Sequence, residues 1–165
     1  PYYITTPIYY VNDKPHIGHA YTTLACEVIA RFMRLDGRDV FFLTGTDEHG
    51  QKVEQSAARR GKSPLEFCDD VSQNFRDLLG VMNFSADRFI RTTEVQHAAA
   101  VQVLWERLVA AGQIYLGTYA GWYSVRDEAF YTESELVDGR APTGAEVEWV
   151  EKEPSYFFRL SEWQA

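Results

Sequence analysis

The first 112 residues alternate between short apolar runs and longer segments in which apolar residues recur every three or four positions. The short runs predict strands, and the recurring pattern predicts helices. The expected strands are 2–10, 40–43 and 88–91, and the expected helices are 17–35, 51–60, 64–78 and 93–111. Because strands that alternate with helices form parallel sheets, we expect a doubly wound parallel α/β sheet over residues 1–112.

Local signals add detail to these elements. Ser63–Glu66 and Thr93–Gln96 have the spacing of capping boxes at the starts of two helices. The apolar stripe of the last helix is expected to face inward, and its members are Val101, Leu104, Leu108 and Ala111. A polar loop, Thr44–Gly50, is expected to follow the second strand.

The pattern changes after Gly112. Residues 114–131 are dense in Tyr, Trp, Phe and Gly, residues 138–144 have the composition of a turn, and residues 146–150 and 156–160 predict further strands. We therefore expect a second, β-rich element over residues 113–165. Because the chain begins without Met and stops where another helix is expected to start, we expect it to be a piece of a longer protein.

Charge and composition narrow the classes of function. With 16 Lys and Arg against 24 Asp and Glu, the net charge is -8, so the chain offers no general basic surface for nucleic acid. No apolar run approaches the roughly 20 residues that span a membrane, and these residues show no signal-peptide pattern, so we expect a soluble protein without a membrane partner. Cys26 and Cys68 lie on apolar stripes and are expected to be reduced core thiols.

Two histidines flank a glycine where the first helix is expected to begin. In parallel sheets, ligands bind beyond the carboxyl ends of the strands, where loops enter helix N-termini. The unpaired N–H groups of the first helical turn favour an anion such as phosphate, and His16 and His19 add further donors. Gly18 lets a base or a phosphate approach the backbone. Two other interpretations stay open: a metal bound by His-x-x-His, or histidines that only pack against or cap the helix.

A second polar loop follows the next strand, so the sheet topology puts it on the same edge as the first loop. Its sequence is TGTDEHG, residues 44–50. A carboxylate there, that of Asp47, can pair with the amino group of a small substrate. Alternatively, Asp47, Glu48 and His49 form a solvated loop that caps the next helix. The presence of two polar loops at one edge favours a binding site.

The residues around both loops resemble a known family. PHIGHA has the form of the HIGH signature of class I aminoacyl-tRNA synthetases. The stretches YYITTPIYYVNDKPHIGHAYTT, RFMRLDGRDVFFLTGTDEHGQKV and FIRTTEVQH closely resemble the methionyl-tRNA synthetase family, as do GTYAGWYSVRDEAFYTESEL and YFFRLSEW. The resemblance covers essentially the whole chain. It implies the first half of a Rossmann-like, HUP-type nucleotide-binding domain over 1–112 and the start of a connective-peptide insertion over 113–165.

The resemblance also implies a reaction and a set of site residues. The reaction is the activation of methionine with ATP, supplied with Mg²⁺, and the transfer of methionine to tRNA(Met). His16 and His19 would be the catalytic residues, which stabilise the α-phosphate as the methionine carboxylate attacks it. The residues implied to bind ATP are Asn12, His16, Gly18 and His19. The residues implied to bind methionine are Ile8, Tyr10 and Asp47, although Ile8 and Tyr10 also fit the core of a strand.

Some features of the family are missing from these 165 residues. The lysine loop of KMSKS type, which grips the triphosphate, is absent, as is the anticodon-binding domain, so we expect the chain alone to be inactive. Many members carry zinc knuckles of CxxC type in the insertion, but the corresponding stretches, 123–127 and 141–144, hold no cysteine. We therefore expect no metal site, and an insertion without zinc that is held by an aromatic core. The expected location is the cytoplasm, with an organellar enzyme as the alternative.

Two other functions share part of this pattern. An adenylyl- or cytidylyltransferase has a similar histidine pair, but it has no evident use for Asp47 or for the long insertion. A truncated relative that binds tRNA or a synthetase partner without activating methionine is the second alternative. Its intact signature argues against loss of activity, and the acidic charge argues against RNA binding by this chain alone.

Overall fold

The computed structural model describes residues 1–164, with the backbone alone at positions 152 and 153. The chain forms two compact units, Pro1–Ala100 and Val101–Ala165, and each is described by itself. The division falls within helix α4 (Val95–Ala110), upstream of the change of sequence pattern at Gly112.

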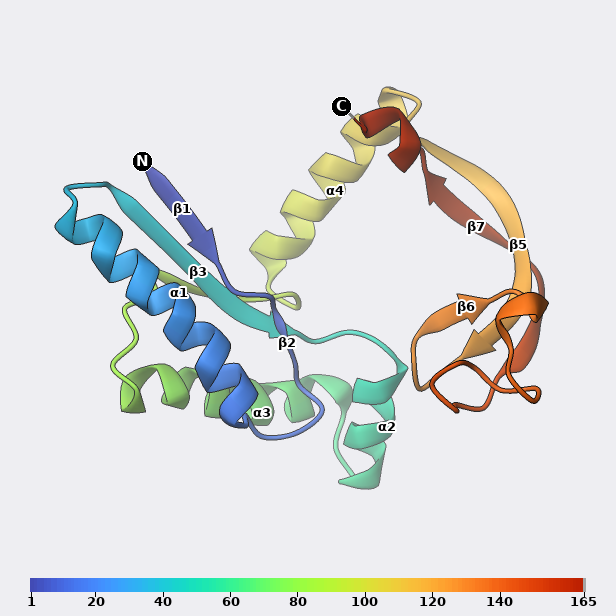
Figure 1. The fold of residues 1–165 in the computed structure, drawn as a ribbon, viewed down its shortest axis with the longest axis horizontal. Helices are drawn as coiled ribbons and strands as arrows, with labels where there is room; N and C mark the ends of the chain where they lie inside the picture. Colours follow the sequence, from blue (N-terminus) through green and yellow to red (C-terminus); the bar gives the residue numbers. More distant parts are fainter. Residues whose placement is uncertain (165) are drawn as a thin grey trace. The chain divides into compact units, whose positions relative to one another are not determined.

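A parallel sheet forms the centre of the first unit (Figure 1). Its strands are β1 (Tyr2–Thr5), β2 (Tyr9–Tyr10), β3 (Val40–Asp47) and β4 (Arg88–Arg91). Leu43 pairs with Thr5 of β1 and with Arg88 of β4, so these two strands lie on opposite edges of β3. Thr46 likewise pairs with β2 and with β4. β3 is therefore the central strand, and β1 and β2 share one of its edges.

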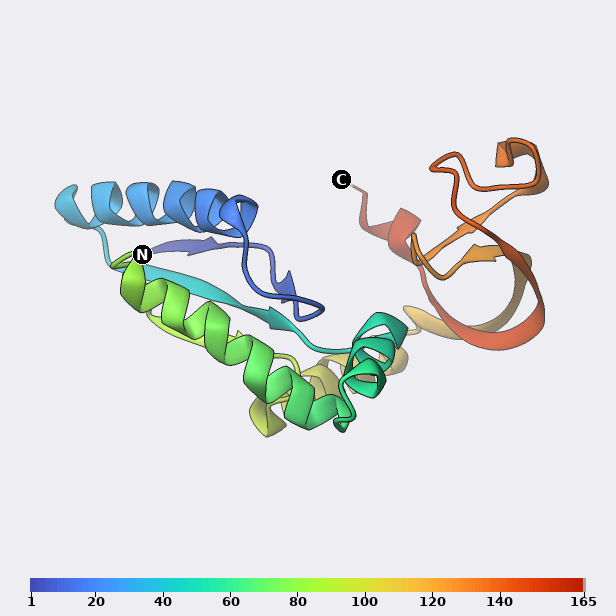
Figure 2. The same cartoon turned by 90° about the horizontal axis from the view of Figure 1, so that it is seen from below.

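Helices cover both faces of this sheet. The helices of this unit are α1 (Ile17–Leu35), α2 (Gln51–Arg59), α3 (Pro64–Val81) and the beginning of α4. Figure 2 shows α1 on one face of the sheet and α3 on the other. The strand pairs β1–β3, β2–β3 and β3–β4 are all parallel. The predicted α/β fold with a parallel sheet is confirmed.

The strands differ from the prediction in two places. The expected strand 2–10 is interrupted at Thr6–Ile8, because Pro7 has no N–H to give to the ladder. The second strand runs on to Asp47, so the expected loop at Thr44–Gly50 is wrong for its first four residues. Buried hydroxyls explain this, since Thr44 Oγ1 lies 2.7 Å from Thr6 Oγ1 and the Thr46 hydroxyl is also bonded within the protein.

Of the two predicted capping boxes, one is confirmed and the other is wrong. Ser63 Oγ accepts a hydrogen bond from the Glu66 N–H at 3.3 Å, and Glu66 Oε2 accepts one from the Ser63 N–H at 3.0 Å. In contrast, the Thr93 hydroxyl donates to the carboxylate of Glu48, and Gln96 accepts from Arg88. The expected box at Thr93–Gln96 is therefore wrong, because tertiary partners take both side chains.

The expected inward stripe of the last helix is also wrong. Val101 and Leu104 on α4 are 49% and 58% exposed, Ala111 is exposed, and Leu108 is half-buried. Three of these four side chains are therefore exposed in the described part of the chain. Their helical spacing was read correctly, but spacing alone does not show which neighbour a stripe meets.

The apolar core of the first unit lies where β2, α2 and α3 meet. Its buried side chains are those of Tyr9, Val11, Val53, Ala57, Phe67, Cys68, Val71 and Phe75. Burial raises the pKa of the Cys68 thiol to about 11, so this thiol stays protonated at neutral pH. Both cysteines are free. The prediction of a core thiol is confirmed for Cys68, whereas Cys26 is only half-buried.

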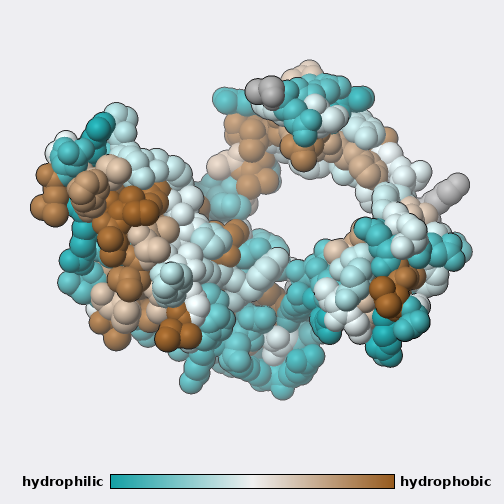
Figure 3. All heavy atoms as spheres, in the orientation of Figure 1, coloured by the Kyte–Doolittle hydropathy of each residue, from teal (hydrophilic) through white to brown (hydrophobic). Residues whose placement is uncertain are grey.

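Helix α1 carries a buried carboxylate on its inner side and apolar residues on its outer side. Glu27 is buried, and its carboxylate accepts hydrogen bonds from Arg31 and from the N–H and hydroxyl of Ser85, the latter two at 2.6 and 3.1 Å. Burial acts to raise the pKa of Glu27, but these hydrogen bonds outweigh it and leave the pKa below its usual value. On the outer side, Ile17 and Leu35 are 87% and 88% exposed, and Figure 3 shows apolar side chains gathered along the helix.

The second unit is an antiparallel sheet. Its strands are β5 (Ile114–Ser124), β6 (Ala129–Tyr131) and β7 (Glu148–Phe158), in the order β6-β5-β7, with short 3₁₀ helices at Glu133–Glu135 and Leu160–Trp163. The two strands predicted at 146–150 and 156–160 are one continuous strand, β7. Pro154 is compatible with β7 because it lies at an edge of the described sheet, where one side of the strand has no ladder.

Aromatic rings pair across the strands of this second sheet. The rings of Trp122 and Trp149 lie 5.3 Å apart and those of Tyr119 and Phe130 lie 4.7 Å apart. Trp149 and Phe130 are exposed, so these rings form exposed pairs and not the closed aromatic core that was expected.

A polar cluster around Asp127 adds to the stability of this unit. The Asp127 carboxylate accepts hydrogen bonds from Thr143, from Tyr131 at 3.1 Å and from Arg126 at 3.2 Å. These contacts, with that of Thr143 the largest, lower the pKa of Asp127. The cluster joins the end of β5 to the 141–145 turn, one of the stretches where zinc-binding relatives are expected to have cysteines.

Candidate functional site

The two histidines at the start of α1 cap the helix reciprocally. His16 is the N-cap residue, and its Nδ1 accepts a hydrogen bond from the Gly18 N–H at 3.1 Å. His19 Nδ1 accepts one from the His16 N–H at 3.0 Å. The two ring centroids lie 3.8 Å apart. The capping interpretation left open by the sequence is therefore correct, and it does not exclude a further role.

This capping decides which atoms can meet a ligand. The Gly18 N–H donates to the His16 ring, and the N–H groups of His19 and Ala20 donate to the His16 carbonyl. The expectation that these backbone groups are unpaired is wrong, because the turn satisfies them itself. Since both Nδ1 atoms act as acceptors, each neutral imidazole carries its proton on Nε2. The donors left for an anion are the two Nε2–H groups and the Ile17 N–H, for which the described residues provide no acceptor, at the positive end of the helix dipole.

Gly18 gives clearance to a neighbouring ring. A Cβ atom at this position would lie 2.8 Å from Cε1 and 3.0 Å from Nδ1 of His16. Any side chain here would displace the His16 ring from its capping position. Glycine is therefore needed at position 18 to leave room for the His16 ring, a requirement that the sequence did not indicate. This is in addition to its predicted role beside ATP.

His19 is held in place by two aromatic rings. The buried Tyr9 lies edge-on to it with centroids 4.8 Å apart, and Phe75 of α3 lies at 5.1 Å. The Tyr9 hydroxyl in turn lies 2.9 Å from Thr23 Oγ1 of α1. Partial burial, and secondarily the nearby His16, lower the pKa of His19 below its ordinary value of 6.5. His19 is therefore neutral at physiological pH.

Protonation of His19 should weaken the fold at mildly acidic pH. The pKa of His19 is lower in the folded than in the unfolded chain, so the unfolded chain binds the proton more readily. The contribution of neutral His19 to the free energy of unfolding is therefore fully present above about pH 6.5. It is lost as the pH falls from there through the lower pKa of the folded chain. The chain has four histidines, and NMR of ¹⁵N-histidine-labelled protein should show His19 as the Nε2–H tautomer at pH 7.5. A His19 pKa above 6.5, or an Nδ1–H tautomer, would contradict the capping geometry.

The residues expected to bind an amino acid lie at the carboxyl end of β3 and on the strand beside it. Asp47 is the last residue of β3 and is half-buried, and its carboxylate has no hydrogen bond or ion pair with another described side chain. Tyr10 of β2 pairs with Asp47 in the sheet. Ile8 and Tyr10 are 43% and 46% exposed, so the alternative that they form a strand core is wrong. Asn12 is exposed in the loop before α1.

Strand β2 brings the two loops to one edge of the sheet. Tyr9 pairs with Thr46 of β3 while its ring contacts His19, and the next residue, Tyr10, pairs with Asp47. The start of α1 and the end of β3 therefore open at the same carboxyl edge, as the sequence predicts. This is the edge at which parallel sheets bind ligands.

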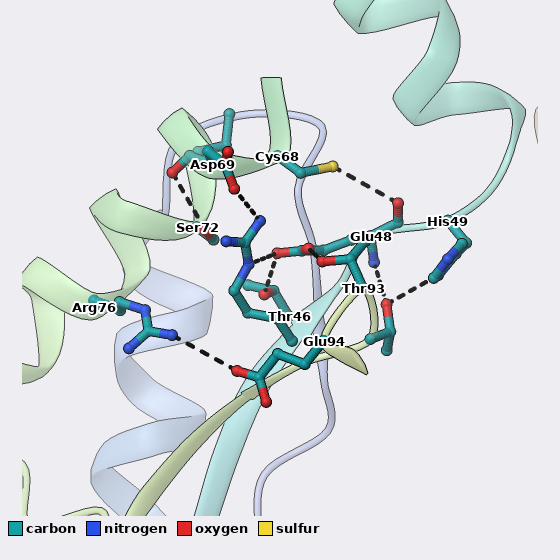
Figure 4. A network of polar contacts seen from close by, with 12 residues as sticks. Thr46, Glu48, His49, Cys68, Asp69, Ser72, Arg76, Thr93 and Glu94 are labelled. Carbon is teal, nitrogen blue, oxygen red and sulfur yellow. Dashed lines mark hydrogen bonds and ion pairs between the residues drawn. The ribbon is translucent and has the colours of Figure 1, made fainter. Parts of the chain in front are cut away.

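The sequence did not single out the polar network on the inner side of this edge. Figure 4 shows the side chains of Thr46 and Thr93 directed at the carboxylate of Glu48, and the Cys68 sulfur directed at its carbonyl. Glu48 also forms an ion pair with Arg91. The interpretation of Glu48 as part of a solvated loop is therefore wrong. A signal was present in the alternation Thr44, Thr46, Glu48, which continues the inward face of β3.

The cavities of the two units do not coincide with the predicted site. A cavity of about 520 Å³ in the second unit is lined by residues of 123–126 and 140–148. A smaller one of about 210 Å³ lies between α2 and α3 behind Glu48 and His49. Neither is lined by His16, His19 or Asp47, which lie on an open edge.

Residues 1–164 contain neither a cluster of metal-ligating side chains nor a membrane-spanning helix. In this part of the chain, no three His, Cys, Asp or Glu side chains are grouped so that they could hold a metal ion. No helix among the same residues is both long enough and apolar enough to cross a bilayer.

Comparisons with known proteins add a family context. The family model described as tRNA synthetases class I (M) matches residues 2–148. The methionine-tRNA ligase of Rickettsia felis is 66% identical over 164 residues, which are 99% of this chain and 32% of that protein. That of Rhizobium meliloti is 56% identical over 169 aligned positions, covering 99% of this chain and 33% of the relative. The chain thus spans about a third of the length of the curated relatives it matches.

Solved structures with the same fold include synthetases of two specificities. A crystal structure of Mycobacterium tuberculosis methionyl-tRNA synthetase bound by methionyl-adenylate aligns with a TM-score of 0.90 and 53% identity, covering 99% of this chain and 33% of that one. LeuRS of Agrobacterium radiobacter K84, in a ternary complex with tRNA, aligns with a TM-score of 0.78 at 21% identity, over 98% of this chain and 21% of that one, and this likeness concerns the fold alone.

Proposed function

Because this chain belongs to the class I tRNA synthetases of the methionine family, we propose that it is the N-terminal third of a methionine-tRNA ligase. In this proposal, residues 1–112 form the first half of the nucleotide-binding catalytic domain, and residues 113–165 begin the connective-peptide insertion. The whole enzyme activates methionine with ATP and transfers it to tRNA(Met). One observation carries the proposal: β2 joins the histidine pair and Asp47 at one edge of the sheet.

The first half of the site binds ATP. The Nε2–H groups of His16 and His19 donate to phosphate oxygens, and the positive end of α1 adds to the attraction. The methionine carboxylate attacks the α-phosphorus, a new oxygen–phosphorus bond forms, and the bond to pyrophosphate breaks. Negative charge grows on the phosphate oxygens in the transition state, where donors that are already in position stabilise it. Asn12 and Gly18 complete this part of the site, and Mg²⁺ accompanies ATP as part of the substrate.

The second half of the site binds methionine. The unpaired carboxylate of Asp47 accepts the ammonium group, which orients the substrate for attack. Ile8 and Tyr10 are exposed, Tyr10 pairs with Asp47 in the sheet, and both residues line the pocket for the thioether side chain. An apolar pocket separates substrates that differ by one methylene by only about 1 to 3 kcal/mol. Rejection of homocysteine therefore requires editing as well as binding.

The finer assignments belong to the same proposal. The insertion is of the type without zinc, because its two knuckle positions lack thiols and Asp127 holds the 141–145 turn through hydrogen bonds. The enzyme acts in the cytoplasm with methionine, ATP and tRNA(Met) as its partners. The predicted lysine loop and anticodon-binding domain lie outside these 165 residues.

Exchange of labelled pyrophosphate into ATP tests the proposed function. The full-length protein should catalyse this exchange when methionine is supplied, and the rate should fall to background when methionine is omitted or replaced by isoleucine. The 165-residue chain alone should show no exchange, since it lacks the lysine loop. Absence of methionine-dependent exchange in the full-length protein would overturn the proposal.

A further inference from the structure

A buried ion pair lies next to Asp47. The Glu48 side chain is fully buried, and its Oε1 lies 2.8 Å from Arg91 Nε, whose side chain is 17% exposed. The hydroxyls of Thr46 and Thr93 also donate to this carboxylate, Thr46 at 2.8 Å. A buried ion pair is costly unless hydrogen bonds satisfy its remaining lone pairs. These donors meet that requirement, so the Glu48 carboxylate is confined to one geometry.

The backbone around Asp47 is anchored as well. The Glu48 N–H donates to Thr92 Oγ1 at 2.9 Å, and the Glu48 carbonyl accepts from the Cys68 thiol at 3.7 Å. On the other side of Asp47, the Thr46 carbonyl accepts from the Thr92 N–H at 3.3 Å. Both peptide groups that flank Asp47 are therefore held by neighbouring elements.

Asp47 itself points the other way. Side chains alternate along a strand, so Asp47 lies on the face opposite to Thr46 and Glu48. Thr46 and Glu48 are buried, while the half-buried Asp47 carboxylate has no partner among the described side chains. The inner face thus carries all the contacts, and the outer face carries a free carboxylate on a fixed backbone.

We propose that Glu48 is a positioning residue, which together with Arg91 fixes the end of β3 so that Asp47 presents its carboxylate to the ammonium group of the amino acid in a single orientation. This inference rests on the proposed function and names one more residue that serves it. A hydrogen-bonding group that is held in place before the substrate arrives has no ordering entropy left to lose. Its effect is therefore on methionine binding, through Asp47.

Helix α3 connects this network with the other half of the site. Asp69 Oδ1 lies 2.7 Å from Arg91 Nη2, although the angle is not that of a hydrogen bond. Six residues further along the same helix, Phe75 packs against the His19 ring. The hydrogen bond to Glu48 raises the pKa of Arg91, so the guanidinium stays charged. Helix α3 therefore contacts both halves of the site, through Asp69 at Arg91 and through Phe75 at His19.

The variant Glu48→Gln tests this inference in the full-length enzyme. It keeps the size of the side chain and an acceptor for Arg91, but it removes the charge that binds the network together. We expect the KM for methionine in the exchange reaction to rise about tenfold, as is typical when one member of a coupled network is changed. The KM for ATP should stay within about twofold of wild type, because the histidine pair is untouched.

Glu27→Gln is the matched control. Glu27 is likewise a buried carboxylate that pairs with an arginine, but it lies on α1 and joins the α3–β4 loop. Its variant should lose a similar amount of stability and leave both KM values unchanged. A second variant, Thr93→Val, removes one donor and keeps both charges, and it should raise the methionine KM by a smaller factor.

Each outcome has a definite meaning. An unchanged methionine KM in folded Glu48→Gln would overturn the inference and leave the proposed function standing. Equal rises in the KM for methionine and ATP, or an equal effect of Glu27→Gln, would assign Glu48 to stability alone and also overturn it. Failure of both Glu48→Gln and Thr93→Val to fold would do the same. If the wild-type enzyme shows no methionine-dependent exchange, the proposed function fails and the inference falls with it.

Discussion

Replacing Asp47 by alanine should weaken methionine binding more than any other single change considered for this site. The carboxylate is the only charged group at the end of β3 that the described contacts leave unpaired, and in the proposed function it meets a substrate ammonium group that has lost much of its water. Truncating one partner of such a pair costs about 2 to 5 kcal/mol. The methionine Kd should therefore rise by a factor of about 30 to several thousand, as measured by titration calorimetry of the full-length enzyme.

The control for this variant is Asp39→Ala. Asp39 is an exposed aspartate at the opposite end of the same strand, where its backbone carbonyl accepts a hydrogen bond from the Tyr2 N–H. Its replacement should leave the methionine Kd at the wild-type value. Near-normal methionine affinity of Asp47→Ala would show that this carboxylate does not bind the ammonium group.

Replacing His19 by alanine should slow adenylate formation far more than it weakens methionine binding. The variant removes an Nε2–H donor that, in the proposed function, acts on charge developing at the α-phosphate. The loss of one such donor lowers the rate by a factor of about 100 to 1000. In the proposed function methionine contacts Asp47 and the pocket residues instead, so its Kd should change little. Single-turnover kinetics separate these two quantities in the full-length enzyme.

The capping role of His19 calls for its own control. The same variant removes the acceptor for the His16 N–H and a ring that packs on Tyr9 and Phe75, so some loss of stability is expected. His97→Ala removes a half-buried imidazole from α4 and touches neither loop. It should leave the rate unchanged. An unchanged rate in folded His19→Ala would refute the transition-state role.

The parts of the site that could be predicted from sequence are those that depend on local pattern. A β-rich run, a proline and a helical stripe place His16 and His19 at a helix start. The alternation of strands with helices predicts that both polar loops lie at the same edge of the sheet. Capping by these histidines stays an open alternative at the level of sequence, and its reciprocal form is not predictable, because histidine is not among the preferred N-cap residues. The tautomer that it imposes becomes known only from the hydrogen bonds.

Contacts between distant residues explain the errors. The apolar run Val40–Leu43 alone predicts the strand, whereas in the structure Thr44 and Thr46 extend it because Thr6 and Glu48 satisfy their hydroxyls. Polar residues on a buried face look like a loop until their partners are known. The same reason accounts for Thr93, whose hydroxyl has the spacing of a cap but is bonded to a carboxylate 45 residues away.

The central position of β3 has a consequence for the order of events during synthesis. One edge of β3 meets strands that precede it in the chain, but the other edge meets β4, which ends at Arg91. The 44 residues from 48 to 91 must leave the ribosome before that edge can pair, which takes roughly 2 to 9 s at ordinary elongation rates. During this interval Glu48 has no arginine, and an open strand edge is available to other chains. The nascent protein is therefore most exposed to aggregation just before its binding edge is complete.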